Sequence, residues 1–180
     1  MNETDYKGIN TLIRTYELRL LKREDVERML KAPDLGSVLD LLSGTVYQFN
    51  REETLRTKNF NQILMNHLVD VYRELFTIAP DSEIVELFTL KSSYHNLKVL
   101  LKQHFLEEQH EDLLIPIGGL SLDALRNLVE TGNSEVAHPI MVEAVQHAKS
   151  DYNEQRLLEA ITVYLDTYYF RHLRIIADRI

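Results

Sequence analysis

The sequence contains no cysteine, which excludes disulfide bonds, thiol catalysis and cysteine-ligated zinc, and fits a cytosolic protein. Glycine and proline are also scarce, at six and four residues in a chain of 180. Few stretches favour β-strands, whereas leucine and the charged helix formers are abundant. This composition predicts an all-α fold. With 44% apolar residues, the chain is long enough to bury a substantial core in one or two domains.

Several motifs of common enzyme classes are absent as well. Neither G-x-x-x-x-G-K-[ST] nor G-x-G-x-x-G occurs, and the one glycine pair, Gly118 and Gly119, follows Pro116 in an expected turn. The G-x-S-x-G elbow of common serine hydrolases is missing too. We therefore expect neither ATP binding through these motifs nor serine hydrolysis of the common type, and no cofactor.

Long apolar runs and clustered basic charge are also lacking. No apolar run reaches the length of a membrane span, and the first residues, MNETDYKG, lack the layout of a secretion signal, so the sequence predicts a soluble protein. The formal net charge is −8, and residues 81–180 carry 9 basic and 16 acidic side chains. This acidic half disfavours nucleic acid as a partner, because phosphates attract clustered Lys and Arg.

Apolar residues spaced three or four apart predict a series of helices. The first is amphipathic, and its stripe is expected to face a core: Tyr6, Ile9, Ile13, Tyr16 and Leu20. Asp81 or Ser82, Ser121 and Pro139 are suited to helix starts, and Gly132 to a helix end. The expected helices cover residues 3–22, 23–30, 35–44, 53–78, 82–108, 122–130 and 139–149, and a last one runs from about 154 onward.

Two similar helix openings suggest an internal duplication. Asn10 in "GINTLIRTYELRLLK" and Asn96 in "SSYHNLKVLLK" lie 86 positions apart, and at this offset four further positions carry identical residues. The order of expected elements also repeats, which is better support than these few identities. The sequence therefore predicts two helical modules, at residues 1–80 and 81–180.

One Glu-x-x-His motif raises the question of a metal site. Glu107 and His110 have the spacing that places a carboxylate and an imidazole on one helix face. Di-iron carboxylate bundles need this motif twice, with two further glutamates, and the nearest substitute here, Glu143 with His147, has a different spacing. We favour a solvated helix end over a metal site, and a metal-dependent helical enzyme around Glu107 and His110 stays as the alternative function.

A polar pair and a tyrosine cluster also stand out. His95 and Asn96 lie within an expected helix, and they fit a hydrogen-bonded pair where two helices cross, with a contact surface or a catalytic base as the other interpretations. Tyr164 and Tyr168 are expected in the core with their hydroxyls near the surface, and Tyr169 is expected to point away from them.

Five segments stand out in order along the chain: "INTLIRTYELRLL", "LLSGTVY", "YHNLKVLLK", the glycine turn at Gly118 and Gly119, and "YLDTYYF". Together they resemble the C subunit of bacterial and archaeal V-type (A-type) ATPases, a relative of the d subunit of eukaryotic V-ATPases. The resemblance covers essentially the whole chain, and the His-Asn-Leu-Lys segment at 95–98 is its most specific part.

The resemblance implies a funnel of three related helical modules around a pseudo-threefold axis, of which this chain holds about two. It also implies a non-catalytic central-stalk adaptor that links the central-shaft subunits to the membrane proteolipid ring, with no cofactor and no metal. Such a protein lies at the cytoplasmic face of the membrane and is held there by protein contacts only. A generic helical scaffold is the remaining alternative.

The residues that we expect to matter are structural or interface residues, and none is expected to be catalytic. Asn10 and Asn96, with His95, are expected to fix helix crossings in the two modules. Four further residues are expected to support those crossings: Tyr6, Arg14, Glu17 and Lys98.

Overall fold

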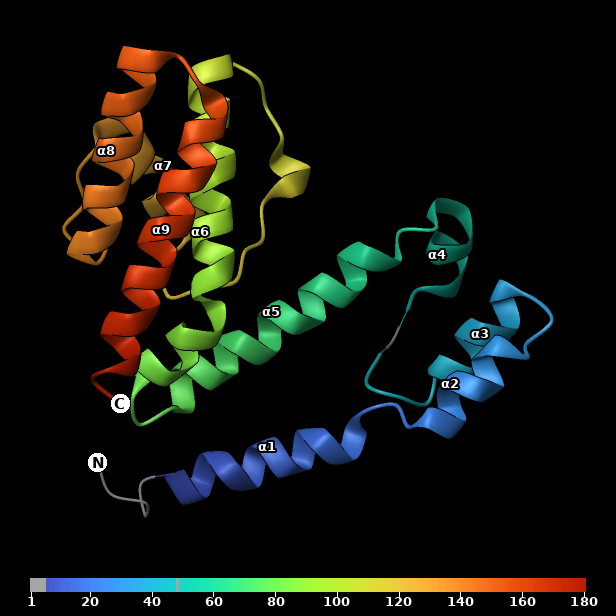
Figure 1. Ribbon diagram of the computed structural model, residues 1–180. Coiled ribbons are helices and arrows are strands. Elements are labelled where there is room, and N and C mark those ends of the chain that lie inside the picture. The colour runs from blue at the N-terminus through green and yellow to red at the C-terminus, as the bar shows by residue number, and fades with distance from the viewer. Residues whose placement is uncertain (1–5, 48) are drawn as a thin grey trace. The chain divides into compact units, whose positions relative to one another are not determined.

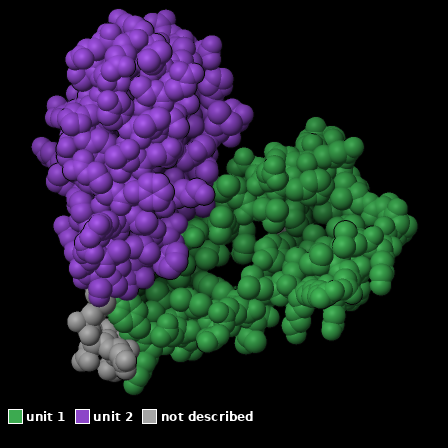
Figure 2. Space-filling view, in the orientation of Figure 1, with its two compact units in different colours: residues 1–80 green, residues 81–180 purple. Residues whose placement is uncertain are grey.

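The computed structural model describes residues 6–47 and 49–180. Its regular elements are helices, and the described ranges contain no strand, which confirms the predicted all-α fold (Figure 1). The chain divides into two compact units, which we call unit 1 (Met1–Pro80) and unit 2 (Asp81–Ile180) (Figure 2).

Unit 1 is a series of mostly short helices. The predicted start of the first helix near residue 3 lies outside the described residues, and the observed helix begins at Lys7. The helices of this unit are α1 (Lys7–Arg19), α2 (Arg23–Leu30), α3 (Leu35–Leu42), α4 (Arg51–Thr57) and α5 (Phe60–Ile78).

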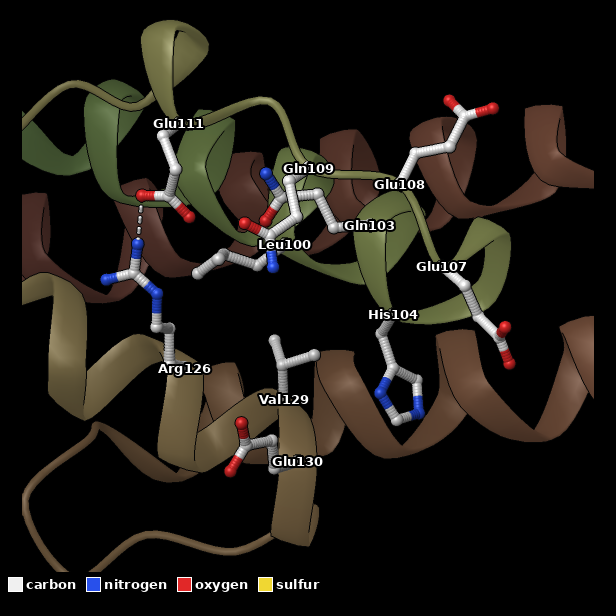
Figure 3. Close-up of a pocket in the computed structure, with 10 residues that line it drawn as sticks. All are labelled: Leu100, Gln103, His104, Glu107, Glu108, Gln109, Glu111, Arg126, Val129 and Glu130. Carbon is white, nitrogen blue, oxygen red and sulfur yellow. Dashed lines mark hydrogen bonds and ion pairs between the residues drawn. The ribbon is translucent and has the colours of Figure 1, made fainter.

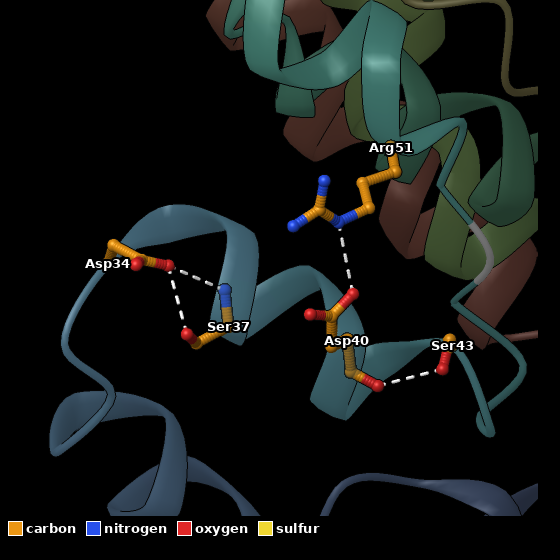
Figure 4. A network of polar contacts seen from close by, with 5 residues as sticks. All are labelled: Asp34, Ser37, Asp40, Ser43 and Arg51. Carbon is orange, nitrogen blue, oxygen red and sulfur yellow. Dashed lines mark hydrogen bonds and ion pairs between the residues drawn. The ribbon is translucent and has the colours of Figure 1, made fainter.

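Polar contacts define α3 and connect it to α4 (Figure 4). Asp34 caps α3, because its Oδ1 accepts hydrogen bonds from the backbone N–H of Ser37 at 2.8 Å and from the Ser37 hydroxyl at 2.9 Å. Arg51, at the start of α4, pairs with Asp40 on α3 at 3.0 Å. The turn between the two helices is thus spanned by an ion pair.

The single long helix predicted over 53–78 is wrong, since two helices occupy this region. Lys58 has a left-handed backbone, with φ of 54°, and it ends α4. Asn59 then caps α5, and its side chain accepts a hydrogen bond from the backbone N–H of Gln62 at 3.3 Å. The regular spacing of apolar residues continues through Lys58 and Asn59, so the sequence pattern did not reveal that one helix ends there and another begins.

The helices of unit 1 bury little. Neither α1 nor α5 contains a buried residue, and Leu39 on α3 is the one buried large apolar residue among the described part of this unit. The prediction that the stripe on α1 faces a core is therefore wrong: Ile13 is exposed, and Leu20 is 55% exposed. The Tyr16 hydroxyl instead donates a hydrogen bond to Glu74 on α5.

Unit 2 contains the longer helices, and their starts follow the predicted caps. Asp81, Ser121 and Pro139 begin three of them as expected, and Gly132 ends one in a left-handed conformation. Two left-handed residues that are not glycine end two other helices: Glu107 ends α6 and Arg156 ends α8. The elements are α6 (Ser82–Leu106), the short 3-10 helix η2 (Glu111–Leu113), α7 (Leu122–Thr131), α8 (Pro139–Gln155) and α9 (Leu158–Ala177).

A single continuous core fills unit 2. Helix α9 packs against both α6 and α8, and α7 packs against α6. Contacts between α6 and α9 pair Lys98 with Asp166 and Glu83 with Arg179, so these two helices run antiparallel. The side chains of the core that are essentially inaccessible to solvent include Leu90, Tyr94, Leu97, Leu101, Leu125, Leu128, Met141, Val145, Ile161, Leu165 and Ile176.

Aromatic residues of unit 2 follow the predictions in part. Tyr168 is buried as expected, and its hydroxyl bonds Glu143 at 2.9 Å. Tyr169 lies against α6, where its half-buried ring meets the Tyr94 ring with 5.8 Å between the ring centroids, whereas Tyr168 bonds α8. Phe88, which has the spacing of a core residue on α6, is 68% exposed.

Candidate functional site

Two neighbouring side chains on α6 hold the segment between α6 and α7, which runs back alongside α6 (Figure 1). Asn96 is 2% exposed, and its side chain donates to the Ile115 carbonyl at 2.7 Å and accepts from the Ile115 N–H at 2.8 Å. The Nε2 of His95 donates to the Leu113 carbonyl at 2.9 Å. The pair therefore holds the end of η2 and the residues after it against α6, and its part in a helix crossing stays a prediction.

Lys98 joins two helices of unit 2. Its ammonium group is half-buried and forms an ion pair with Asp166 on α9. This pair lies one helical turn beyond Tyr94, whose ring contacts both Tyr169 and His172. Lys98 thus supports the contact between α6 and α9.

The candidates of unit 1 do not form a matching arrangement. Asn10 is exposed on α1, unlike its counterpart Asn96, and its role at a helix crossing stays a prediction. Arg14 and Glu17 form an exposed ion pair along α1 at 2.6 Å. Tyr6 directly precedes α1 and is half-buried. Exposed ion pairs of this kind contribute little to stability.

A pocket of about 260 Å³ lies where α6 ends, between that end and α7 (Figure 3). Figure 3 shows an ion pair between Arg126 and Glu111 on one side and the carboxylates of Glu107 and Glu108 on the other. Burial and the nearby Lys149 lower the pKa of His104 in its wall. The remaining lining residues are Leu100, Gln103, Gln109, Val129 and Glu130.

The metal-site alternative loses its geometric basis in this region. Helix α6 ends at Leu106 and Glu107 is left-handed, so Glu107 and His110 do not share a helix face. His110 instead pairs with Glu108 at 3.1 Å. In the ranges that the structure describes, no three metal-ligating side chains converge.

Sequence reasoning missed two polar clusters in unit 2. The first surrounds the Tyr168 hydroxyl, which lies 2.9 Å from Glu143 and 2.6 Å from His147 Nδ1, with the Arg171 guanidinium over its ring. Burial and the Glu143 carboxylate raise the pKa of Tyr168. The only sequence signal for this cluster was the spacing of Glu143 and His147, which places both on one face of α8.

The second cluster contains two histidines. The rings of His138 and His172 lie 4.4 Å apart between centroids, at an interplanar angle of 32°. His172 is 1% exposed, and burial, His138 and Arg179 lower its pKa to about 4. The two residues are separated by a whole helix in the sequence, so their spacing gave no signal.

The fold and these contacts define a helical protein whose polar candidate residues secure loops and helix contacts. None of the helices in the described part of the chain is long and apolar enough to cross a membrane. The chain belongs to the ATP synthase (C/AC39) subunit family, whose model matches residues 9–180. The family resemblance found in the sequence is thereby confirmed.

A named relative agrees with the family. The chain is 26% identical over 176 residues to the C subunit of the V-type sodium ATPase of Enterococcus hirae. The alignment covers 98% of this chain and 53% of that relative, so the chain spans about half the relative's length. No solved structure matches the chain significantly.

Proposed function

We propose that this protein is a non-catalytic central-stalk adaptor of a rotary V/A-type ATPase. It links the central-shaft subunits to the membrane proteolipid ring, and so connects ATP hydrolysis or synthesis to ion transport. The observation that carries the proposal is the match of residues 9–180 to the ATP synthase (C/AC39) subunit family. The sodium in the name of the E. hirae relative makes sodium the first ion to test.

The contacts of the candidate residues support a mechanical role. An adaptor needs a rigid body and a shaped surface, and the continuous core of unit 2 provides rigidity. Asn96, His95 and Lys98 all bind other parts of the chain. On this proposal the protein lies at the cytoplasmic face of the membrane, held by protein contacts only, and binds no nucleic acid.

We also propose that the two units are related modules of a pseudo-threefold funnel. Unit 1 has the order α1, α2, α3, α4 and α5, and unit 2 has the order α6, η2, α7, α8 and α9. In both orders a short capped helix, α3 or α7, occupies the third place, and its N-cap is Asp34 or Ser121. Superposition of the two units in an experimental structure would test the relation.

A pull-down tests the adaptor function. The full chain is incubated with purified central-shaft subunits and, separately, with detergent-solubilised proteolipid ring, and metal content is measured on the same sample. We expect saturable, one-to-one capture by at least one partner without metal. Failure of both captures would contradict the proposal, and stoichiometric iron, manganese or zinc in that sample would favour the metal-dependent alternative.

Variants of exposed residues can show which of the two units binds the partner captured in the pull-down. Phe170 on α9 and Leu18 on α1 are 65% and 82% exposed, so replacing either with Ser leaves the core intact. If unit 2 binds the captured partner through α9, Phe170→Ser weakens capture and Leu18→Ser does not. Thr167→Ala, at an exposed position on α9, is the matched control.

A further inference from the structure

The start of α8 is capped by an imidazole. The Nδ1 of His138 accepts a hydrogen bond from the backbone N–H of Ile140 at 3.3 Å. An imidazole nitrogen accepts only when it carries no proton, so the proton of neutral His138 lies on Nε2. The cap therefore requires that His138 be neutral.

The ring of His138 lies against the ring of a second histidine, so protonation of both rings would bring two positive charges close together. His172, on α9, is buried, and the centroid of its ring lies 4.4 Å from that of His138. The Nδ1 of His172 lies 3.4 Å from the Tyr94 hydroxyl on α6. Two like charges at this separation would repel each other in a medium of low polarity.

Among the charged groups around the pair, Glu83 favours a proton on His138, but burial and Arg179 outweigh it. Arg179, which follows α9, adds positive charge, and its guanidinium is paired with Glu83 on α6 at 3.0 Å. Glu86, also on α6, is half-buried, and burial raises its pKa. The first turn of α8 contains no acidic residue. No hydrogen bond joins a carboxylate to either imidazole in the described part of unit 2.

We propose that His138 and His172 form an acid-sensitive lock, which holds the first turn of α8 against α9 while both rings are neutral. A proton on His138 Nδ1 removes the acceptor for the Ile140 N–H. It also places positive charge at the N-terminus of α8, where the helix dipole is already positive. Acid therefore releases the start of α8, and the lock needs no ATPase partner, so its test is independent of the proposed function.

The directions of the pKa shifts agree with this geometry. Burial and Arg179 lower the pKa of His138, and burial, His138 and Arg179 lower that of His172 to about 4. The unfolded chain then binds more protons than the folded chain below about pH 6.5, so stability is complete above that pH and is lost towards pH 4. For His172 alone, the unfolding equilibrium constant rises roughly 20-fold between pH 7 and pH 5.

The test measures the unaltered full chain first. NMR of the imidazole nitrogens reports the tautomer and titration of both histidines, and amide hydrogen exchange reports protection of Ile140 and Met141. We expect the proton of His138 on Nε2 at pH 7, titration of both rings below the ordinary range, and protection at Ile140 that falls about tenfold or more from pH 7 to pH 5, after correction for intrinsic exchange.

One variant separates capping from titration. His138→Asn keeps a good N-cap acceptor without a titrating ring, so its stability should depend less on pH than that of the unaltered chain. His110→Asn removes an exposed imidazole from unit 2 and should keep the original pH dependence. An unchanged pH dependence in His138→Asn would overturn the lock, as would a proton on Nδ1 at pH 7. If His138→Asn does not fold, the tautomer and titration of the unaltered chain decide.

Discussion

At the scale of single residues, Asn10 and Asn96 show how one sequence signal can have two outcomes. Both precede an amphipathic run at the duplicated helix opening, yet Asn96 is buried and bonded to Ile115, whereas Asn10 is exposed. The sequence identified Asn96 and His95 as a hydrogen-bonded polar pair. It could not identify their partners, because the end of η2 and the residues after it meet α6 only through the tertiary fold.

Asn96→Ala should destabilise the protein by about 2 kcal/mol, because it leaves the N–H and C=O of Ile115 without a side-chain partner. Asn10→Ala is the matched control, and at an exposed position it should change stability by less than about 0.5 kcal/mol. Urea denaturation of both variants measures the difference. Equal effects would show that the bonds to Ile115 contribute nothing measurable.

Gly118 is a second residue whose backbone conformation and close neighbour both favour glycine at its position. Its φ is 152°, and a Cβ there would lie 2.6 Å from the Ser93 hydroxyl oxygen. Gly118→Ala should cost about 1–3 kcal/mol, mainly from the backbone, so adding Ser93→Ala should restore only part of the loss. Thermal unfolding measures both, with Gly44→Ala as the control, since nothing lies within 4 Å of a Cβ at Gly44. If Ser93→Ala fully restored the stability, the contact between the added Cβ and the Ser93 hydroxyl, and not the backbone, would account for the whole loss.

At the scale of helices, the starts and ends were predicted correctly where a residue with a known preference for a helix terminus stands there. Asp81, Ser121, Gly132 and Pro139 carry such signals, and the structure uses all four. Other ends were missed because their residues carry no glycine signal. Lys58, Glu107 and Arg156 are left-handed there, although an L residue in this conformation is strained.

Lys58→Gly should therefore stabilise the protein by about 0.5–1 kcal/mol, because glycine adopts the left-handed conformation at the end of α4 without strain. The control is Lys31→Gly, at the end of α2, where φ is −91° and glycine offers no such relief. That variant should be neutral or destabilising. Denaturant midpoints compare the two, and a destabilised Lys58→Gly would show that the backbone at Lys58 is not strained.

At the scale of the whole molecule, the two units differ in how much they bury. Composition predicted a substantial core, but it could not say where that core lies, since apolar residues are spread along the chain. The structure places nearly all of the large buried side chains in unit 2, and unit 1 buries Leu39 as its one large apolar residue in the described part. In the His138–His172 pair, His172 is buried and His138 is half-buried, and their contact joins α9 to the start of α8, which explains why no local pattern revealed it.

The last prediction concerns independent folding of the two units. Residues 81–180, expressed alone, should form a helical domain that unfolds cooperatively, because their core is continuous. Residues 1–80 alone should lack a cooperative transition, because a chain that buries so little apolar surface does not offset its conformational entropy. Circular dichroism during heating and amide hydrogen exchange compare the two fragments under one set of conditions. A sharp transition in residues 1–80 would show that the exposed stripes on α1 and α5 pack together more closely than here, and loss of helix in residues 81–180 would show that unit 2 depends on contacts with the rest of the chain.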